Sequence, residues 1–351
     1  MERRCSTERE MGLIGRRGFL AGAAGLLAAT GAAAGSAAGR GVKFCLFADL
    51  HYWPGVFPND TTEFLDRILK RAEDNEVDFV LHLGDLVHFP MQLKGFVDRY
   101  NDFHIPTYHT VGNHEFESSV EDVLKAYRLE RAYYSFDRGG FRFVITDPNY
   151  ILRNGELVHF SNSNWRTTNK RPGDRIYWIP PEQLKWLKET IDASPYPCVV
   201  MAHESYERPG AGGVQNQEEV RAIFDAANAR TPGKVRLVMT GHYHVDYLRV
   251  LRGIPYLEVN SANFFFAGKH HDKYPADYMK GLKQSSHTLT WKEPLSAIVT
   301  LGHNGHIRIE GSRSEWLYGI SPEKAGLPLL DEVGRPNTAM IQSVDMTLGA
   351  V

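Results

Sequence analysis

The sequence predicts a mixed α/β fold, and three features of the 351-residue chain carry this prediction. Short apolar runs stop at glycine or at polar side chains, which is typical of buried parallel strands whose ends open into loops. Amphipathic stretches with helical spacing lie between these runs. After residue 244 the pattern changes to a series of short strands. Taken together, the three features indicate a mixed α/β domain.

The first forty residues are predicted to be a targeting segment outside the fold. Arg16-Arg17 precedes a mildly apolar run of Ala, Gly and Leu, and the small residues Ala32–Ala34 and Ser36–Ala38 suit a cleavage site. This pattern resembles a twin-arginine export signal, so we expect periplasmic or extracellular localisation through the twin-arginine machinery, without a stable membrane anchor. The alternative is an uncleaved anchor or a disordered tail.

The predicted elements then follow in order along the chain. Asp60, with Glu63 three residues later, opens a helix whose apolar stripe begins at Phe64. This helix lies between two apolar runs, which predicts a right-handed strand–helix–strand unit. Gly139-Gly140 predicts a hairpin. Further helices are predicted at about 91–103, from Pro180 onward and over Gln217–Ala229. Later strands are predicted at Tyr247–Leu251, Tyr256–Asn260, Leu295–Leu301 and His306–Glu310.

Five predicted strands end in side chains that bind metals. The five strand-end segments, in chain order, are Asp49-Leu50-His51, Gly84-Asp85, Gly112-Asn113-His114-Glu115, Ala202-His203-Glu204 and Gly241-His242-Tyr243-His244. Any one of these segments alone is a weak signal. Because carboxyl ends of parallel strands meet at one edge of a sheet, five together predict a single site.

These segments, in this order, resemble the motifs of the calcineurin-like metallophosphoesterase superfamily. The resemblance covers Asp49 to His244 and implies two facing mixed sheets flanked by helices, a four-layer α/β/β/α sandwich. It implies a phosphoesterase domain over residues 41–311, followed by a C-terminal tail, 312–351, of unknown role.

The resemblance also implies a ligand set for two metal ions. Asp85 would bridge both ions, Asp49, His51 and His244 would complete one, and Asn113, His203 and His242 would complete the other. Imidazole, carboxylate and amide ligands without thiolate favour Mn, Fe, Zn, Co or Ni over Cu(I) or calcium. Two such ions can clamp the attacking and leaving oxygens of a displacement at phosphorus.

His114 and Glu115 are the catalytic candidates that the resemblance implies. His114 would face the phosphoryl group and help to protonate the leaving oxygen, and Glu115 would fix the His114 ring. Two positions differ from the motifs of related branches of the superfamily, and these differences narrow the range of possible substrates. His88 stands where purple acid phosphatases have a tyrosine ligand, and we interpret it as a rim residue rather than a substitute ligand. Phe89 stands where protein Ser/Thr phosphatases have an arginine, which weighs against phosphoprotein substrates.

Charge and cysteine content limit the partners. Without residues 1–40 the chain keeps 34 Lys and Arg (40 minus 6) and 39 Asp and Glu (42 minus 3), a formal net charge of −5. This acidic balance weighs against nucleic acid as a partner, because proteins that bind nucleic acid carry a basic surface. Cys45 and Cys198 lie in predicted strands and are expected to be two buried thiols.

The predicted function is hydrolysis of a small phosphomonoester or phosphodiester at a dinuclear site. Hydrolysis of pyrophosphate or of a phospholipid headgroup is the second interpretation, and a catalytically silent metal-binding protein is the third. Two segments rich in aromatic and basic residues, Pro148–Trp178 and Asn263–Trp291, are predicted to be irregular. They either contact the substrate or serve as structural cover for the sheets.

Overall fold

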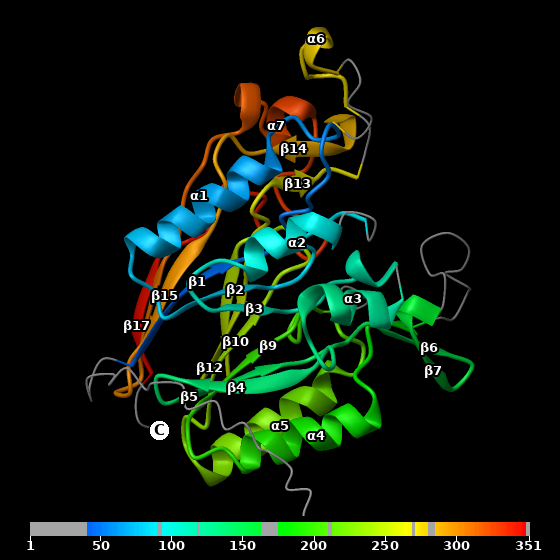
Figure 1. Cartoon of the computed structure of the whole chain (residues 1–351). Helices are drawn as coiled ribbons and strands as arrows, with labels where there is room; N and C mark the ends of the chain where they lie inside the picture. The colour runs from blue at the N-terminus through cyan, green and yellow to red at the C-terminus, as the bar shows by residue number, and fades with distance from the viewer. Residues whose placement is uncertain are drawn as a thin grey trace, which may run out of the picture. The chain divides into compact units, whose positions relative to one another are not determined.

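Two six-stranded sheets form the core of the part of the chain that the structure describes (Figure 1). The computed structural model describes residues 41–89, 93–117, 119–162, 175–209, 213–268, 271–279 and 285–348. All of them belong to one compact unit, residues 37–351. The export signal predicted for residues 1–40 lies outside the described residues.

The first sheet has the strand order β17-β16-β15-β1-β2-β3. Its strands are β1 (Val42–Phe47), β2 (Phe79–His82), β3 (Thr107–His109), β15 (Ala297–Leu301), β16 (His306–Glu310) and β17 (Val344–Thr347). β1, β2 and β3 run parallel, with Phe44 opposite Phe79. β15 joins β1 antiparallel. The parallel pairing of β1 with β2 brings the loops at Asp49 and Asp85 to one edge.

The second sheet has the strand order β11-β12-β10-β9-β5-β4. Its strands are β4 (Tyr134–Arg138), β5 (Phe141–Ile145), β9 (Cys198–Met201), β10 (Val235–Thr240), β11 (Tyr247–Leu251) and β12 (Ile254–Glu258). β12 begins two residues before the predicted Tyr256, because Arg252 and Gly253, both at positive φ, form a two-residue turn. The predicted hairpin at Gly139-Gly140 joins β4 to β5.

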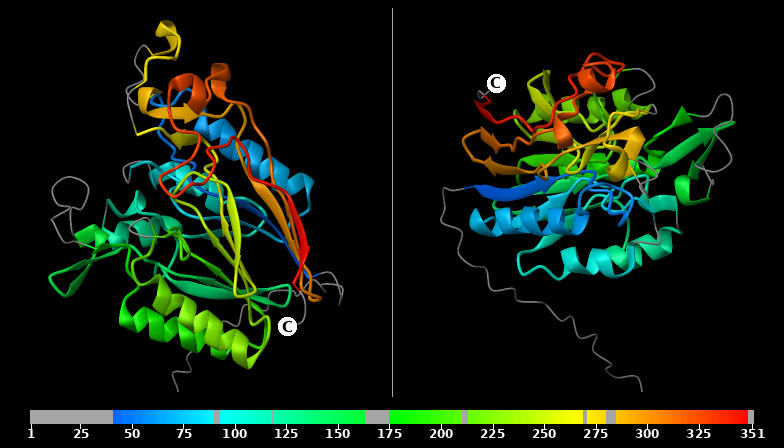
Figure 2. Two further views of the ribbon diagram at one scale, coloured as in Figure 1. Left: turned by 180° about the vertical axis from the view of Figure 1, so that it is seen from behind. Right: turned by 90° about the horizontal axis from the view of Figure 1, so that it is seen from above.

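The central strands of each sheet are buried on both faces, in keeping with four layers (Figure 2). On β1, Phe44 and Leu46 belong to the core between the sheets, and Cys45 and Phe47 belong to the core under the helices. Phe44 meets Phe143 of the second sheet edge to face, with ring centroids 5.5 Å apart. Side chains of a strand alternate between its faces, so a continuous apolar run fills both layers. The predicted α/β/β/α architecture is confirmed.

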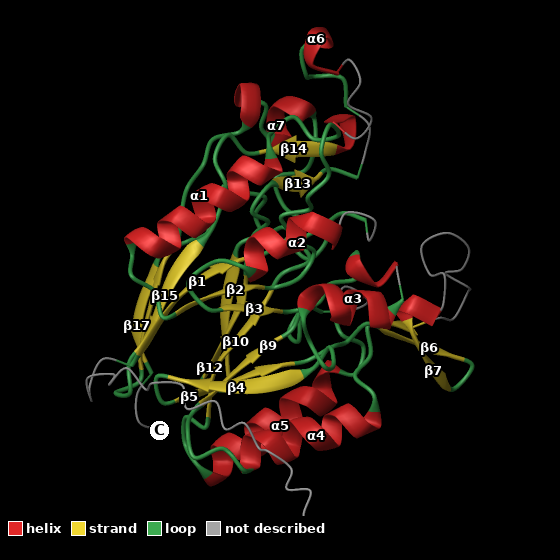
Figure 3. Cartoon of the chain, viewed as in Figure 1, coloured by secondary structure: helices red, strands yellow, loops and turns green. Residues whose placement is uncertain are grey.

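Helices cover the outer face of each sheet (Figure 3). The longer helices are α1 (Thr61–Asp74), α2 (Leu93–Asn101), α3 (Val120–Tyr127), α4 (Pro181–Asp192) and α5 (Gln217–Arg230). α1 contacts β1 and β2, α4 contacts β5, and α5 contacts β10. The predicted start of α1 is confirmed, because the Asp60 carboxylate accepts from the N–H groups of Thr62 and Glu63 at 2.8 and 3.3 Å.

The two segments predicted to be irregular contain short regular elements in their described parts, so that prediction is wrong. These elements are β6 (Tyr150–Arg153), β7 (Glu156–His159), β8 (Arg175–Ile176), β13 (Phe264–Phe266), α6 (Ala276–Met279) and β14 (Thr288–Thr290). Runs of two to four residues are too short to display a period, so tertiary pairing decides them.

The chain after residue 311 is packed onto the domain rather than set apart from it. A short helix, α7 (Pro322–Ala325), is followed by β17, which pairs antiparallel with β16. Between them, the buried Arg335 side chain forms ion pairs with Glu207 and Glu258 of the second sheet region. The segment that the sequence left without a role thus adds a strand to the first sheet.

Two smaller predictions concern cysteines and membranes. Cys45 in β1 and Cys198 in β9 are buried free thiols, as the sequence predicts. Burial raises the pKa of the Cys45 thiol to about 12, so this group stays neutral at physiological pH. Within the described ranges, every helix is too short or too polar to cross a bilayer.

Candidate dinuclear metal centre

The predicted ligands lie on loops that follow strands of both sheets. Asp49 and His51 follow β1, Asp85 follows β2, and Asn113 follows β3. From the second sheet, His203 follows β9, and His242 and His244 follow β10. The loops are joined by backbone hydrogen bonds, from Asp49 N–H to Gly84 O and from Gly241 N–H to His203 O. The structure therefore brings all seven residues to one region.

The backbone of these loops is strained. Five predicted ligands adopt positive φ, a conformation that costs L-residues about 1 kcal/mol or more each: Asp49, His51, Asp85, His242 and His244. Two neighbouring positions require glycine because other side chains lie very close to their backbone. A side chain at Gly84 would overlap the His203 ring, and one at Gly112 would overlap the Asp85 carboxylate. Such strain is concentrated at functional sites, where surrounding contacts impose it.

One group of ligand atoms, called site A, comes from Asp49, His51, Asp85 and His244. His51 Nε2 lies 3.2 Å from His244 Nε2, 3.8 Å from Asp49 Oδ1 and 3.7 Å from Asp85 Oδ2. His244 Nε2 lies 3.4 Å from Asp49 Oδ1. Ligands that hold one transition ion at about 2.0–2.1 Å are themselves separated by roughly 3.0–3.4 Å. Site A is therefore close to the size that such an ion requires.

A second group, called site B, comes from Asp85, Asn113, His203 and His242. His203 Nε2 lies 3.1 Å from Asp85 Oδ2 and 3.2 Å from His242 Nδ1. The buried Asn113 Oδ1 has no hydrogen-bond partner among the described residues, and neither has Asp49 Oδ1 in site A. Buried oxygens without partners are costly unless a cation satisfies them. These residues therefore fit a pair of metal ions.

Asp85 joins the two sites through a single oxygen. Its Oδ2 faces His51 of site A and His203 of site B, whereas its Oδ1 accepts the backbone N–H of His114 at 2.9 Å. This hydrogen bond fixes the carboxylate plane and leaves Oδ2 as the shared ligand atom. The bridging role that the family resemblance implies for Asp85 thus has a geometric basis.

Outer contacts orient the other ligands. His203 Nδ1–H donates to Leu83 O at 2.6 Å, and His244 Nδ1–H donates to Phe264 O at 2.7 Å. Asp49 Oδ2 accepts the backbone N–H of His242 at 2.9 Å. Because each contact occupies one atom, the opposite nitrogen or oxygen is directed into the site.

The charges at the site favour a cation. Burial lowers the pKa of His51 and His242 well below the ordinary value, so both rings are neutral and present lone pairs. Burial would raise the pKa of Asp85, but the neighbouring His203 and His114 hold it well below its usual range. The Asp85 carboxylate therefore stays ionised and attracts the positive charge that a metal ion supplies.

His114, the predicted catalytic acid, lies at the edge of site A. Its Nδ1–H donates to His88 O at 2.9 Å, and its Nε2 lies 3.9 Å from Asp85 Oδ2. The ring helps to line a cavity of about 270 Å³ over the site. A larger cavity of about 930 Å³ lies beside α5 and β11 and contains none of the predicted site residues.

Glu115 does not have the role that the sequence analysis assigned to it. Its buried carboxylate accepts the backbone N–H groups of Asp85, Val87 and Gly112 at 3.1, 3.2 and 2.8 Å. It therefore fixes the loop that carries Asp85, and the His88 carbonyl holds the His114 ring in its place. Burial, followed by the Asp85 charge, raises the pKa of Glu115 to about 7. Sequence spacing could not show which of two nearby acceptors the His114 ring would contact.

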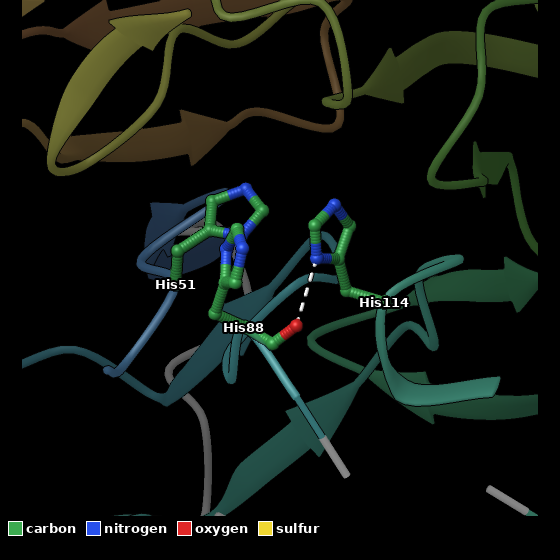
Figure 4. Close-up of side chains that lie close together, drawn as sticks. All are labelled: His51, His88 and His114. Atoms are coloured by element: carbon green, nitrogen blue, oxygen red, sulfur yellow. Dashed lines mark hydrogen bonds between the residues drawn. The ribbon is translucent and has the colours of Figure 1, made fainter. Parts of the chain in front are cut away.

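His88 combines the predicted place at the rim with a contact that the sequence did not predict. Its ring helps to line the cavity, but the residue is buried and its Nδ1 lies 3.2 Å from His51 Nδ1. Figure 4 shows His51, His88 and His114 converging. The only sequence signal was the position of His88, three residues after Asp85.

Two curated proteins are similar to this chain over more than half of its length. The chain is 26% identical over 217 residues to a 3′,5′-cyclic-nucleotide phosphodiesterase of Nostoc sp., a match that covers 59% of this chain and 71% of that protein. It is 24% identical over 210 residues to the 3′,5′-cyclic adenosine monophosphate phosphodiesterase CpdA of Haemophilus influenzae, covering 55% and 68%.

A solved structure and a family model extend the comparison. The crystal structure of a dimetal phosphatase from Danio rerio matches with a TM-score of 0.57 over 88% of this chain and 100% of that chain. At 15% identity this likeness shows the fold alone. The family model described as calcineurin-like phosphoesterase matches residues 42–246, which include every predicted ligand. The chain therefore belongs to the calcineurin-like phosphoesterase family.

Proposed function

We propose that the protein hydrolyses a small nucleotide phosphodiester, with a 3′,5′-cyclic nucleotide as the first candidate. Family membership makes it a hydrolase of phosphoric ester bonds, and the two similar phosphodiesterases act on cyclic nucleotides. The observation that carries the proposal is the shared Asp85 Oδ2 between two ligand groups, with His114 Nε2 beside it. We propose Mn, Fe or Zn for both sites, from the mixture of imidazole and carboxylate ligands.

The metal ions, the two carboxylates and His114 have different roles in the proposed reaction. Two bound divalent ions supply the charge that stabilises the transition state and activate water near neutral pH. Asp49 and Asp85 neutralise two of the four positive charges, so the site attracts an anionic phosphodiester. His114 donates its Nδ1–H to the His88 carbonyl, which leaves Nε2 directed toward the cavity. In the imidazolium form, which carries a proton on both nitrogens, Nε2–H would donate a hydrogen bond to the phosphoryl group and pass its proton to the leaving oxygen, and the ring would return to the neutral form with Nδ1–H still bound to the His88 carbonyl.

The test compares diester and monoester substrates on the same metal-loaded protein. The purified protein is stripped with chelator, reloaded separately with Mn²⁺, Zn²⁺ or Fe²⁺, and assayed with 3′,5′-cyclic AMP, bis-p-nitrophenyl phosphate and p-nitrophenyl phosphate. We expect at least about tenfold faster hydrolysis of the diesters. Faster hydrolysis of the monoester would refute the substrate class. Full activity in chelator would refute the metal mechanism, and metal binding without any activity would favour the silent metal-binding alternative.

We also propose that residues 1–40 direct export by the twin-arginine route. The support is the Arg16-Arg17 pair before a mildly apolar run. Substitution of both arginines by lysine is expected to retain the precursor in the cytoplasm, measured by fractionation and immunoblotting against a wild-type control. Unchanged export of the double variant would contradict the proposal.

A further inference from the structure

His88 contacts the site through two different groups. Its side chain meets the His51 ring, with the two Nδ1 atoms 3.2 Å apart. Its backbone carbonyl accepts the Nδ1–H of His114 at 2.9 Å (Figure 4). The two partners do different work, because His51 belongs to site A and His114 is the proposed acid. Residue 88 thus connects a metal ligand to the proton donor.

The geometry of site A determines where the protons lie on His51 and His88. His51 directs Nε2 at Asp49, Asp85 and His244, so a metal ion uses the lone pair of that nitrogen. The proton of the neutral His51 ring is then on Nδ1, which donates to His88 Nδ1. His88 Nδ1 is the acceptor, and the proton of its ring lies on Nε2.

This contact differs from those that hold two of the other imidazole ligands. His203 and His244 donate to backbone carbonyls, of Leu83 and Phe264. A backbone acceptor is present whatever the side chain at that position. His51 instead donates to a side chain, so its orientation depends on the identity of residue 88.

Aromatic contacts keep the His88 ring in place. Trp53 stacks on it with ring centroids 4.4 Å apart and an interplanar angle of 15°. Phe57 and Phe89 meet the ring edge to face, at centroid distances of 5.7 and 4.8 Å. His88 is 5% exposed, and its ring also helps to line the cavity over the site. An acceptor whose ring is held by packing fixes the ring of a metal ligand more firmly than a mobile one.

We propose that His88 is a positioning residue that orients His51 for the ion of site A. The proposal rests on the dinuclear centre described above. Three converging imidazoles also suggest another use, a third metal ion held by His51, His88 and His114. That use would require His51 to bind ions through both nitrogens and so to lose its last proton. It would also place two cations on one imidazole ring, so the structure favours the hydrogen bond.

Two substitutions separate the acceptor from the ring. His88→Asn keeps an acceptor near the position of Nδ1 but loses the stacked ring. His88→Phe keeps a ring against Trp53 but loses the acceptor. Both leave the carbonyl that holds His114. His104→Ala is the control, because it removes an imidazole whose side chain is 61% exposed, away from the site.

The measurement is metal affinity and metal environment in the full chain, without substrate. We expect His88→Phe to bind one of its two ions about 10- to 100-fold more weakly, and His88→Asn to stay much closer to wild type. With Mn²⁺, the electron paramagnetic resonance spectrum of His88→Phe should change from that of a coupled pair to that of an isolated ion. Circular dichroism of the chelated proteins checks that both variants are folded.

Several outcomes would overturn the proposal. Unchanged affinity for both ions in His88→Phe would show that His51 needs no partner there. Equal losses in Phe and Asn variants would mean that ring packing, not the acceptor, matters. A third bound ion in the wild type, lost in both variants, would establish the three-histidine site instead. Wild-type protein that binds no metal would refute the dinuclear centre itself, which is a separate result.

Discussion

His114 and Asp85 meet at the same site, but their substitutions should have different signatures. Asp85 Oδ2 belongs to both ligand groups, so Asp85→Asn should weaken both metal sites and slow every substrate alike. His114 is held by the His88 carbonyl and supplies no ligand atom in this arrangement. We therefore expect His114→Gln to retain its metal content.

The dependence of the rate on the leaving group tests the role of His114. A nitrophenolate needs little protonation, so His114→Gln should retain most of its rate on that substrate. An alkoxide needs the proton, and the loss should approach about 10²–10⁴-fold. The measurement is log rate against leaving-group pKa for both enzymes, with metal content determined in the same samples. Parallel lines would limit His114 to holding the phosphate.

His82 and His109 form a buried pair whose protonation opposes folding. Gly84 N–H donates to His82 Nδ1, so His82 Nε2–H donates to His109 Nδ1 at 2.6 Å, and His109 Nε2–H donates to the side-chain Oδ1 of Asn101. Both rings are therefore neutral. Burial is the main cause that lowers the pKa of His82 to about 3 and that of His109 well below its ordinary value.

These two pKa shifts predict a loss of stability in acid. The unfolded chain binds protons on both rings below about pH 6.5, whereas the folded protein does not until about pH 3 for His82. The free energy of unfolding should therefore fall as the pH drops through this window, by up to about 1.4 kcal/mol per pH unit for each ring. In urea titrations with chelator present, we measure the free energy of unfolding as a function of pH. His82→Gln should reduce the number of protons taken up on unfolding, which this slope reports, by about one. An unchanged slope would contradict the assignment.

At the scale of an element, buried ion pairs hold the C-terminal segment to the rest of the domain. Arg335 brings a positive charge between the buried carboxylates of Glu207 and Glu258, and it also stacks over the Tyr247 ring. Arg208 binds Asp331 and Glu332 of this segment, and its guanidinium lies 3.8 Å from the centre of the Tyr243 ring. In the sequence, Tyr243 stands between the predicted ligands His242 and His244. The segment is thus anchored to the loop that carries His242 and His244.

Removal of Arg335 should destabilise the protein strongly. Arg335→Met leaves the buried carboxylates of Glu207 and Glu258 without the positive charge of Arg335. Such a change lowers the free energy of unfolding by about 3–5 kcal/mol. We expect a correspondingly lower urea midpoint, with part of the loss recovered when Glu258→Gln is added. Lys70→Met is the matched control, because the Lys70–Asp74 pair is exposed and worth little. Equal stability of Arg335→Met and wild type would show that the C-terminal segment contributes no anchoring.

At the scale of the whole described unit, the metal centre joins the two sheets. Site A combines Asp49, His51 and Asp85 of the first sheet with His244 of the second. Site B combines Asp85 and Asn113 with two histidines that follow β9 and β10. Metal ions should therefore stabilise the packing between sheets as well as support the chemistry.

Metal binding should raise the unfolding temperature reversibly. An ion that binds only the folded protein adds about 2.7 kcal/mol when its concentration is 100 times its dissociation constant. We expect the midpoint to rise on titration with Mn²⁺ or Zn²⁺ and to fall with chelator. Asp85→Asn should lose most of this response and His114→Gln should keep it. A metal-independent midpoint in the wild type would contradict the centre.

The sequence by itself determined the layered fold, and it predicted the residues that the structure brings together at the proposed metal centre. Apolar runs such as Lys43–Ala48 and Phe79–Leu83 are buried on both faces, and their period and their polar ends are local properties of the chain. For the same reason, Asp49, Asp85 and the paired His242 and His244 could be predicted as ligands. Each lies in the loop that follows a strand, and the parallel strands bring these loops together at one edge.

Tertiary structure alone decided which atoms meet. The contact of Glu115 with backbone rather than with His114, and the burial of His88 against His51, depend on side-chain directions that sequence spacing does not encode. The strands β13 and β17 are too short to show a period and form only because a neighbouring strand offers hydrogen bonds. Arg335 finds its carboxylates 77 and 128 residues away along the chain, a pairing that only the folded packing could bring about.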